Sequence, residues 1–257
     1  MSKAINKPKI LLLDIETAPL IVYAWSLYDK FTPITNIVEP GHTLCFAAKW
    51  LGEKEVIFDS INDSRPGDMI RKVWKLLDEA DAVIHYNGKK FDIPVLEAEF
   101  LLAKLKPPAP TPQIDLLQTA RRFRLPSRKL DYISQRLGLG QKTKHKGMEL
   151  WRQCMAGDEA AWKIMERYNR QDVKLLEKLY YELRPWIKSH PNMSVYRKDT
   201  EERVCPVCGS THIRWKGYRT TSTARYRRFV CTDCGSWGQS TSLDSSLPKA
   251  NTRSFKA

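Results

Sequence analysis

The fold is decided by Lys9-Ile10-Leu11-Leu12-Leu13-Asp14-Ile15-Glu16-Thr17, a short apolar run that ends in two carboxylates. A run this short and this rich in Leu and Ile is typical of a β-strand covered on both faces. Side chains alternate along a strand, so we expect Asp14 and Glu16 on one side and Ile15 on the other. Adjacent buried carboxylates repel each other, which predicts a divalent cation between them. The alternative is a solvated strand end without function.

The chain is strongly basic, because its 257 residues carry a formal net charge of +14 and the isoelectric point is near 9.5. Such an excess of Lys and Arg favours nucleic acid as the partner, since neutralised phosphates release counterions. An anionic membrane surface is the alternative partner, but no basic amphipathic helix dominates the chain and no apolar run approaches the roughly 20 residues of a spanning helix, so we expect no membrane contact. The first residues lack the pattern of a signal peptide. The expected location is therefore the cytoplasm.

Strand and helix signals alternate along the first part of the chain. Alternation and turn residues predict strands at 42–50, 55–59 and 82–86, the first two joined as an antiparallel hairpin. Helical periodicity predicts helices at 66–80, 93–105, 129–137 and 159–183. Residues 113–117 are a short strand or a helix start after the proline-rich connector 106–112, and residues 18–41 show no assignable pattern. This order predicts an α/β domain with a mixed sheet flanked by helices.

Two further positions carry candidate carboxylates. Asp92 follows the strand at 82–86, where its simplest role is to cap the next helix. Tyr168 and Asp172 lie four residues apart on the longest predicted helix, so both project from one face. Each signal is weak by itself.

A second, small domain is indicated by two Cys-x-x-Cys pairs, each followed by glycine. The pairs are Cys205 with Cys208 and Cys231 with Cys234, separated by 22 residues. Four thiolates in this arrangement predict a structural Zn²⁺ site, and the metal would supply the folding energy that so short a segment lacks. A disulfide framework is the alternative, but it requires an oxidising compartment. We expect Cys45 and Cys154 to be core residues.

Aromatic and cationic side chains interleave between the two cysteine pairs. Rings of this kind stack on bases while cations follow phosphates, although some of the rings must form the core of so small a domain. From Ser189 onward the chain has 12 Lys and Arg against 5 Asp and Glu, so this part carries +7 of the +14. The candidates for nucleic-acid contact are Trp215, Tyr218, Arg225, Arg227 and Arg228.

The predicted organisation has four parts. Residues 1–188 form the α/β domain, 189–203 a linker, 204–238 the zinc ribbon and 239–257 a disordered basic tail.

Asp14-Ile15-Glu16, Asn87 to Asp92 and Tyr168 to Asp172 follow one another in the order of three exonuclease motifs. Over residues 9–185 the chain therefore resembles the DEDD superfamily of 3′-5′ exonucleases. It is most similar to the tyrosine-containing (DEDDy) branch, found in the proofreading domains of family B DNA polymerases. The resemblance implies an RNase H-like fold.

The resemblance also implies roles for individual residues. Asp14, Glu16, Asp92 and Asp172 match the four carboxylates that bind two Mg²⁺ or Mn²⁺ ions, and Tyr168 matches the tyrosine that orients the attacking water.

Asn87 and Phe91 are expected to shape the strand end and the pocket for the terminal nucleotide. The chain departs from family B polymerases in having no room for a polymerase domain and in carrying the predicted ribbon.

The expected function is a stand-alone exonuclease that degrades single-stranded DNA from 3′ ends to 5′-mononucleotides by two-metal hydrolysis. Its expected setting is phage or bacterial DNA replication or repair, with a DNA polymerase or another replication protein as a candidate partner. One alternative is a 3′-5′ exoribonuclease, because nothing in the sequence selects the sugar. Another is a non-catalytic adaptor that binds nucleic acid through the ribbon.

Overall fold

The computed structural model describes residues 8–28, 31–196, 203–221 and 224–241. The chain separates into two compact units, one spanning Lys9–Tyr180 and the other built from Tyr181 onward. The separation falls before the predicted boundary at 188/189. No helix within the described ranges is both long and apolar enough to cross a membrane.

The first unit is built on a five-stranded mixed sheet with the order β5-β4-β1-β6-β7. The apolar run forms its central strand, flanked by an antiparallel neighbour on one side and a parallel neighbour on the other. The hairpin of the second and third strands is also present, which confirms the predicted mixed α/β fold. The strands are β1 (Ile10–Thr17), β4 (Thr43–Trp50), β5 (Ile57–Ser60), β6 (Ala82–His85) and β7 (Gln113–Asp115).

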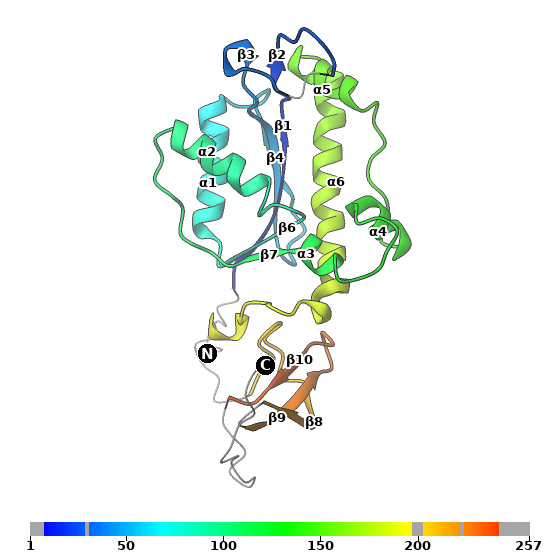
Figure 1. The fold of residues 1–257 in the computed structure, drawn as a ribbon. Coiled ribbons are helices and arrows are strands. Elements are labelled where there is room, and N and C mark those ends of the chain that lie inside the picture. Colours follow the sequence, from blue (N-terminus) through cyan, green and yellow to red (C-terminus); the bar gives the residue numbers. More distant parts are fainter. Residues whose placement is uncertain (1–7, 29–30, 197–202, 222–223, 242–257) are drawn as a thin grey trace. The chain divides into compact units, whose positions relative to one another are not determined.

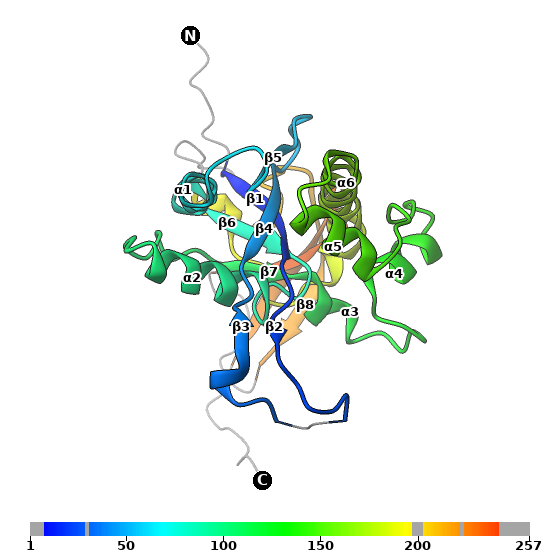
Figure 2. The same cartoon turned by 90° about the horizontal axis from the view of Figure 1, so that it is seen from above.

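Helices cover both faces of this sheet. Figures 1 and 2 show α1 (Pro66–Glu79) and α2 (Asp92–Leu102) on one face, and α5 (Met148–Met155) and α6 (Glu159–Leu183) on the other. Leu11, Leu13 and Ile15 of β1 pack in the core under α1 and α2. The intervening residues of β1 consequently face α6.

The α5 and α6 side has its own core. Cys45 and Cys154 are buried there together with Trp162, Met165 and Tyr168. The expectation that the two single cysteines are core residues is therefore confirmed.

Several predicted boundaries differ from those observed, most by a single residue. The helix predicted to reach residue 105 ends at Leu102, because Lys104 adopts a left-handed φ of 56° and the chain turns there into the proline-rich connector. The strand predicted at 55–59 is β5 at Ile57–Ser60. Residues 113–117 are both a strand and a helix start, since the Asp115 carboxylate caps α3 (Leu116–Ala120). The next helix, α4 (Leu130–Arg136), lies within its predicted range.

The stretch without an assignable pattern forms a small extension directly after β1. Its strands β2 (Ile21–Val22) and β3 (Ile37–Glu39) pair with each other, and a helical turn, η1 (Ile34–Asn36), precedes β3. The sequence shows no periodicity here because the large apolar side chains, among them Trp25 and Leu27, lie exposed rather than on a buried face.

The second unit contains a three-stranded antiparallel sheet with the order β10-β9-β8. Its strands are β8 (Ile213–Thr220), β9 (Arg225–Cys231) and β10 (Trp237–Gln239), and the helical turns η2 (Arg184–Trp186) and η3 (Met193–Tyr196) precede them. The structure corrects the predicted linker and the predicted start of the C-terminal tail. The predicted linker contains η3, whose Met193 is buried and donates its backbone N–H to the Pro206 carbonyl, and the predicted tail begins within β10. Residues 242–257 of that tail lie outside the described part.

Candidate functional site

Three carboxylates meet on the face of β1 that α6 covers. Asp14, Glu16 and Asp172 each offer an oxygen, and these oxygens all lie within 4.8 Å of one another. Strand alternation brings the first two together, because Ile15 between them points to the opposite core. Helix α6 contributes the third from a nearly fully buried position. Two segments more than 150 residues apart in sequence thus build one acidic cluster.

Asp92 lies beside this cluster and binds to its strand. The Oδ1 atom of Asp92 accepts a hydrogen bond from the backbone N–H of Ile15 at 3.1 Å. The expected capping role is wrong, since Asp92 is itself the first residue of α2 and Phe91 occupies the cap position without a side-chain bond. Burial raises the pKa of Asp92 to about 6, although the bond from Ile15 opposes that shift.

Burial and mutual repulsion hold protons on the clustered carboxyl groups. Desolvation raises the pKa of Asp14 well above its usual value, and the neighbouring carboxylates raise it further. The pKa of Glu16 rises to about 8, chiefly through burial and then through the charge of Asp172. One oxygen of Asp172, Oδ1, is buried and has no hydrogen-bond partner among the described residues. An all-oxygen group with an unpartnered buried oxygen fits a hard divalent cation such as Mg²⁺ or Mn²⁺.

Lys142 is the one described cation whose ion pair reaches the cluster. Its Nζ donates to Oδ2 of Asp172 and, at 3.1 Å, to the hydroxyl of Tyr168. Burial is the largest single effect on the pKa of Lys142 and lowers it, but the electrostatic effects of Asp172, Tyr168 and Asp14 together outweigh burial, so the net shift is upward. A single ammonium balances only part of the negative charge of the cluster, which leaves room for a divalent cation.

Tyr168 and Asp172 project from one face of α6, as their spacing predicts, and Lys142 links them. The phenol ring makes an edge contact with His145 at a centroid distance of 4.7 Å, and His145 packs in turn against Trp151. Burial raises the pKa of Tyr168, and the Asp172 carboxylate adds to this effect. The tyrosine is therefore a neutral hydrogen-bonding group held beside the carboxylates.

Asn169 is a site residue that the sequence analysis missed. It is fully buried, and its Nδ2 donates to Oδ2 of Asp14 at 2.7 Å. The thiol of Cys45 lies on the other side of the amide, 3.8 Å from its Oδ1. Asn169 thereby fixes one oxygen of Asp14. Its sequence signal was an amide three residues before Asp172, on the buried face of the same helix.

Asn87 and Phe91 lie in the turn between β6 and α2. Asn87 has a left-handed φ of 73° and donates its backbone N–H to Asp115 at 2.9 Å. The next residue, Gly88, donates to the buried ring of His85 and leaves no space for a Cβ atom. The turn is thus fixed from within, and Phe91 remains partly exposed at its end. Their expected contact with the terminal nucleotide stays a prediction.

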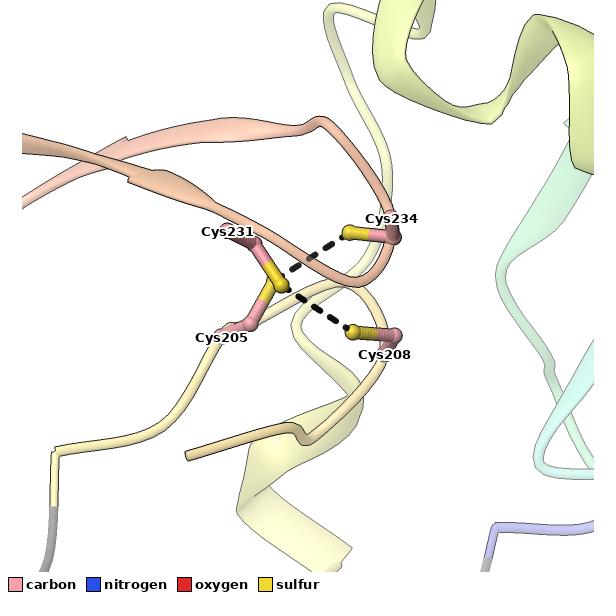
Figure 3. A group of neighbouring side chains, drawn as sticks. All are labelled: Cys205, Cys208, Cys231 and Cys234. Atoms are coloured by element: carbon pink, nitrogen blue, oxygen red, sulfur yellow. Dashed lines mark hydrogen bonds between the residues drawn. The ribbon is translucent and has the colours of Figure 1, made fainter. Parts of the chain in front are cut away.

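The four cysteines of the second unit also converge. Figure 3 shows their side chains pointing toward one another, and the sulfur atoms all lie within 4.8 Å. All four are free thiols, so the disulfide alternative is not what the structure contains. Gly209 and Gly235 have φ values of 73° and 72°, the left-handed conformation expected for the turn after each pair. The group suits a tetrahedral metal ion.

The five residues predicted to contact nucleic acid do not share one surface. Trp215 pairs with Phe229 and Tyr218 pairs with Arg227 across β8 and β9, so these side chains share one face of the sheet. Arg225 lies on that face too, two residues from Arg227, whereas Arg228 points to the opposite face.

The raised carboxyl pKa values predict a pH-dependent stability. Between about pH 4 and pH 8 the folded cluster keeps protons that the unfolded chain releases, so without divalent ions stability falls as pH rises. Mg²⁺ should raise the melting temperature by several degrees at pH 8 and little at pH 5, because protons compete with it. Differential scanning fluorimetry measures both.

The double variant Asp14→Asn/Glu16→Gln provides the control for this prediction. It should show a flatter pH profile and no response to Mg²⁺. An equal Mg²⁺ effect at both pH values in the unaltered chain would contradict the assignment.

Comparisons with known proteins agree with this architecture. The chain is similar to the solved structure of the family B DNA polymerase from the hyperthermophilic archaeon Pyrobaculum calidifontis, with a TM-score of 0.51 and 20% sequence identity. The match covers 69% of this chain and 25% of that one, so this chain corresponds to about a quarter of the polymerase. No curated protein matches. Residues 38–184, more than half of the sequence, match the model of the RNase H superfamily, and the chain therefore belongs to that superfamily.

Proposed function

We propose that this protein is a metal-dependent 3′-5′ exonuclease of the DEDDy type that releases 5′-mononucleotides from single-stranded DNA ends. The observation that carries the proposal is the convergence of Asp14, Glu16 and Asp172 within 4.8 Å, with Asp92 bonded to the same strand. Clustered, desolvated carboxylates of this kind destabilise a fold unless protons or cations neutralise them. Membership of the RNase H superfamily supports a nuclease, and the fold shared with a DNA polymerase favours DNA.

Each residue of the site has a distinct part in the proposed reaction. Two divalent cations, when bound, activate water and stabilise the attacking and leaving oxygens at phosphorus. Asp14, Glu16, Asp92 and Asp172 hold those cations. The neutral hydroxyl of Tyr168 orients the attacking water.

Two side chains position these groups. Asn169 holds one oxygen of Asp14 in place through its 2.7 Å hydrogen bond. Lys142 donates to both the Tyr168 hydroxyl and the Asp172 carboxylate, which fixes their positions relative to each other. Its charge also offsets part of the negative charge of the cluster. The substrate end would enter beside Asn87 and Phe91, in the turn that follows β6.

The proposed metal of the second unit is a structural Zn²⁺ bound by Cys205, Cys208, Cys231 and Cys234. Four sulfurs in a closed group favour zinc over the oxygen-preferring cations of the first unit. The proposed setting is DNA replication or repair in a phage or bacterium, with a DNA polymerase as a candidate partner.

A cleavage assay with matched variants tests the proposed activity. Asp14→Ala and Asp172→Asn should each lower hydrolysis by at least about a hundredfold, because each removes a cation ligand, while nucleic-acid binding survives. Asp68→Asn, which removes an exposed carboxylate on α1, should cleave normally. The measurement is a time course on gels with 5′-labelled single-stranded DNA and a matched RNA, in Mg²⁺, in Mn²⁺ and without divalent ions.

A metal-dependent ladder that shortens from the 3′ end is the expected result, and the faster substrate identifies the sugar preference. Undiminished cleavage by either variant would overturn the assigned site. Intact substrate in every lane, with binding independent of Mg²⁺, would instead favour the non-catalytic adaptor.

Metal analysis tests the zinc proposal. The chain purified without chelators should contain about one Zn²⁺, and Cys231→Ser/Cys234→Ser should lose it, since serine is a poor zinc ligand. Cys154→Ala, which alters a cysteine of the first unit, should retain the metal. Zinc that persists in the double variant would exclude this ligand set.

A further inference from the structure

The sheet of the second unit has two chemically different faces. Strand alternation and the pairs Trp237 with Val230, Gln239 with Arg228 and Arg214 with Val230 assign one set of side chains to a common face. We call it the Trp237 face, and its members are Arg214, Lys216, Arg219, Tyr226, Arg228, Val230, Trp237 and Gln239. The opposite Phe229 face carries Trp215, Tyr218, Arg225, Arg227 and Phe229.

The rings of the Phe229 face are occupied by contacts within the unit. Phe229 is only 5% exposed and meets the ring of Trp215 edge-on at 5.5 Å. The guanidinium of Arg227 lies 4.9 Å from the Trp215 ring. Arg225 covers the ring of Tyr218 in the same way, at 4.6 Å. This face therefore supplies the small core and its cover.

The Trp237 face is open by comparison. Trp237 is 51% exposed although it belongs to a paired strand. It borders a hollow of about 280 Å³ that Arg219, Arg228, Gly238 and Gln239 complete. Gly238 pairs with Phe229, and a Cβ atom there would lie 2.3 Å from the Phe229 ring, so the glycine makes room for that core ring on the opposite face.

The cations around the hollow are held in place. Arg219 donates from Nη1 to Oε1 of Gln239 at 3.0 Å, and Arg228 donates from Nε to the Lys216 carbonyl at 2.7 Å. Each bond uses one donor of a guanidinium group that has five. Arg228 and Lys216 also lie over the Trp237 ring, at 5.2 Å and 6.0 Å from its centroid, and the ring still stays half exposed.

The charge of this sheet is uncompensated within its strands. The segments Ile213–Thr220, Arg225–Cys231 and Trp237–Gln239 contain six Lys and Arg and no Asp or Glu. Exposed arginines that border a tryptophan match a single-stranded nucleic acid, whose bases stack on rings and whose phosphates bind guanidinium groups.

We infer that the Trp237 face is a binding site for single-stranded nucleic acid. One base stacks on Trp237 in the hollow, and the flanking phosphates bind Arg219 and Arg228, with Arg214 and Lys216 extending the path. Tyr218, Arg225 and Arg227, which the sequence analysis selected, stabilise the unit instead. The inference rests on the proposed function only for the strandedness of the ligand.

Binding without cleavage tests this inference. The full chain carrying Asp14→Ala, with its zinc and without Mg²⁺, is titrated with fluorescent oligothymidylate and followed by anisotropy. Trp237→Ala should weaken binding about fivefold to a hundredfold, and Trp237→Phe should restore most of it, because stacking needs a ring. Arg219→Gln/Arg228→Gln should weaken binding. It should also make the slope of the logarithm of the binding constant against the logarithm of salt concentration less steep, by roughly 0.7 per lost phosphate contact.

Arg225→Gln/Arg227→Gln is the matched control, because it removes the same charge from the opposite face. It should change affinity less than about threefold. Zinc content is measured for every variant and identifies any variant that fails to fold. If Trp237→Ala does not fold, the surface variant Arg219→Gln/Arg228→Gln tests the binding site instead. Equal losses from the two arginine pairs, or unaltered binding by Arg219→Gln/Arg228→Gln, would overturn the inference.

The outcomes also separate this site from the proposed nuclease activity. A chain that binds through Trp237 but cleaves nothing supports the inference and contradicts the exonuclease. A chain that cleaves DNA while the Trp237-face variants bind normally supports the exonuclease and contradicts the inference.

Discussion

Repulsion among Asp14, Glu16 and Asp172 is the constraint on which the first unit depends. The central place of β1 in the sheet half-buries its two carboxylates, and helix α6, 25 residues long, adds a third that is buried. Such a group is unfavourable unless protons or cations neutralise it. The raised pKa values of Asp14 and Glu16 show this cost, because protons are held more tightly where negative charge is unfavourable. Divalent ions would bind at the same carboxylates.

Neighbouring groups reduce this cost without removing it. Lys142 contributes one positive charge at Asp172, the Ile15 amide bonds Asp92, and the Asn169 amide bonds Asp14. None of the three cancels the remaining negative charge. A site that is pre-positioned but still electrostatically incomplete is what a metal-dependent phosphodiesterase requires, because cations then bind together with the phosphate. The second unit differs, because its four thiols form a closed group. A metal bound there would stabilise the fold rather than take part in a reaction.

Local patterns predicted most of this architecture. The period of two in β1 and the Tyr168–Asp172 spacing in α6 are properties of single elements, and they predicted which side chains share a face. Contacts between segments that are distant in sequence produce no local pattern from which they could be predicted. Lys142 and Asn169 became recognisable only when the loop before α5 and the buried side of α6 met the carboxylates. Likewise, composition showed that the C-terminal part of the chain is cationic, but only the strand pairing shows that Arg228 and Arg227 lie on opposite faces of the sheet.

The carboxylate cluster of the first unit is proposed to bind divalent cations. Anomalous diffraction from crystals grown with Mn²⁺ tests it most directly. Manganese peaks are expected beside the carboxylates of Asp14, Glu16 and Asp172, which would hold the ions, with the Lys142 ammonium displaced from Asp172. A cluster without manganese at saturating concentration, with Lys142 still paired to Asp172, would contradict it.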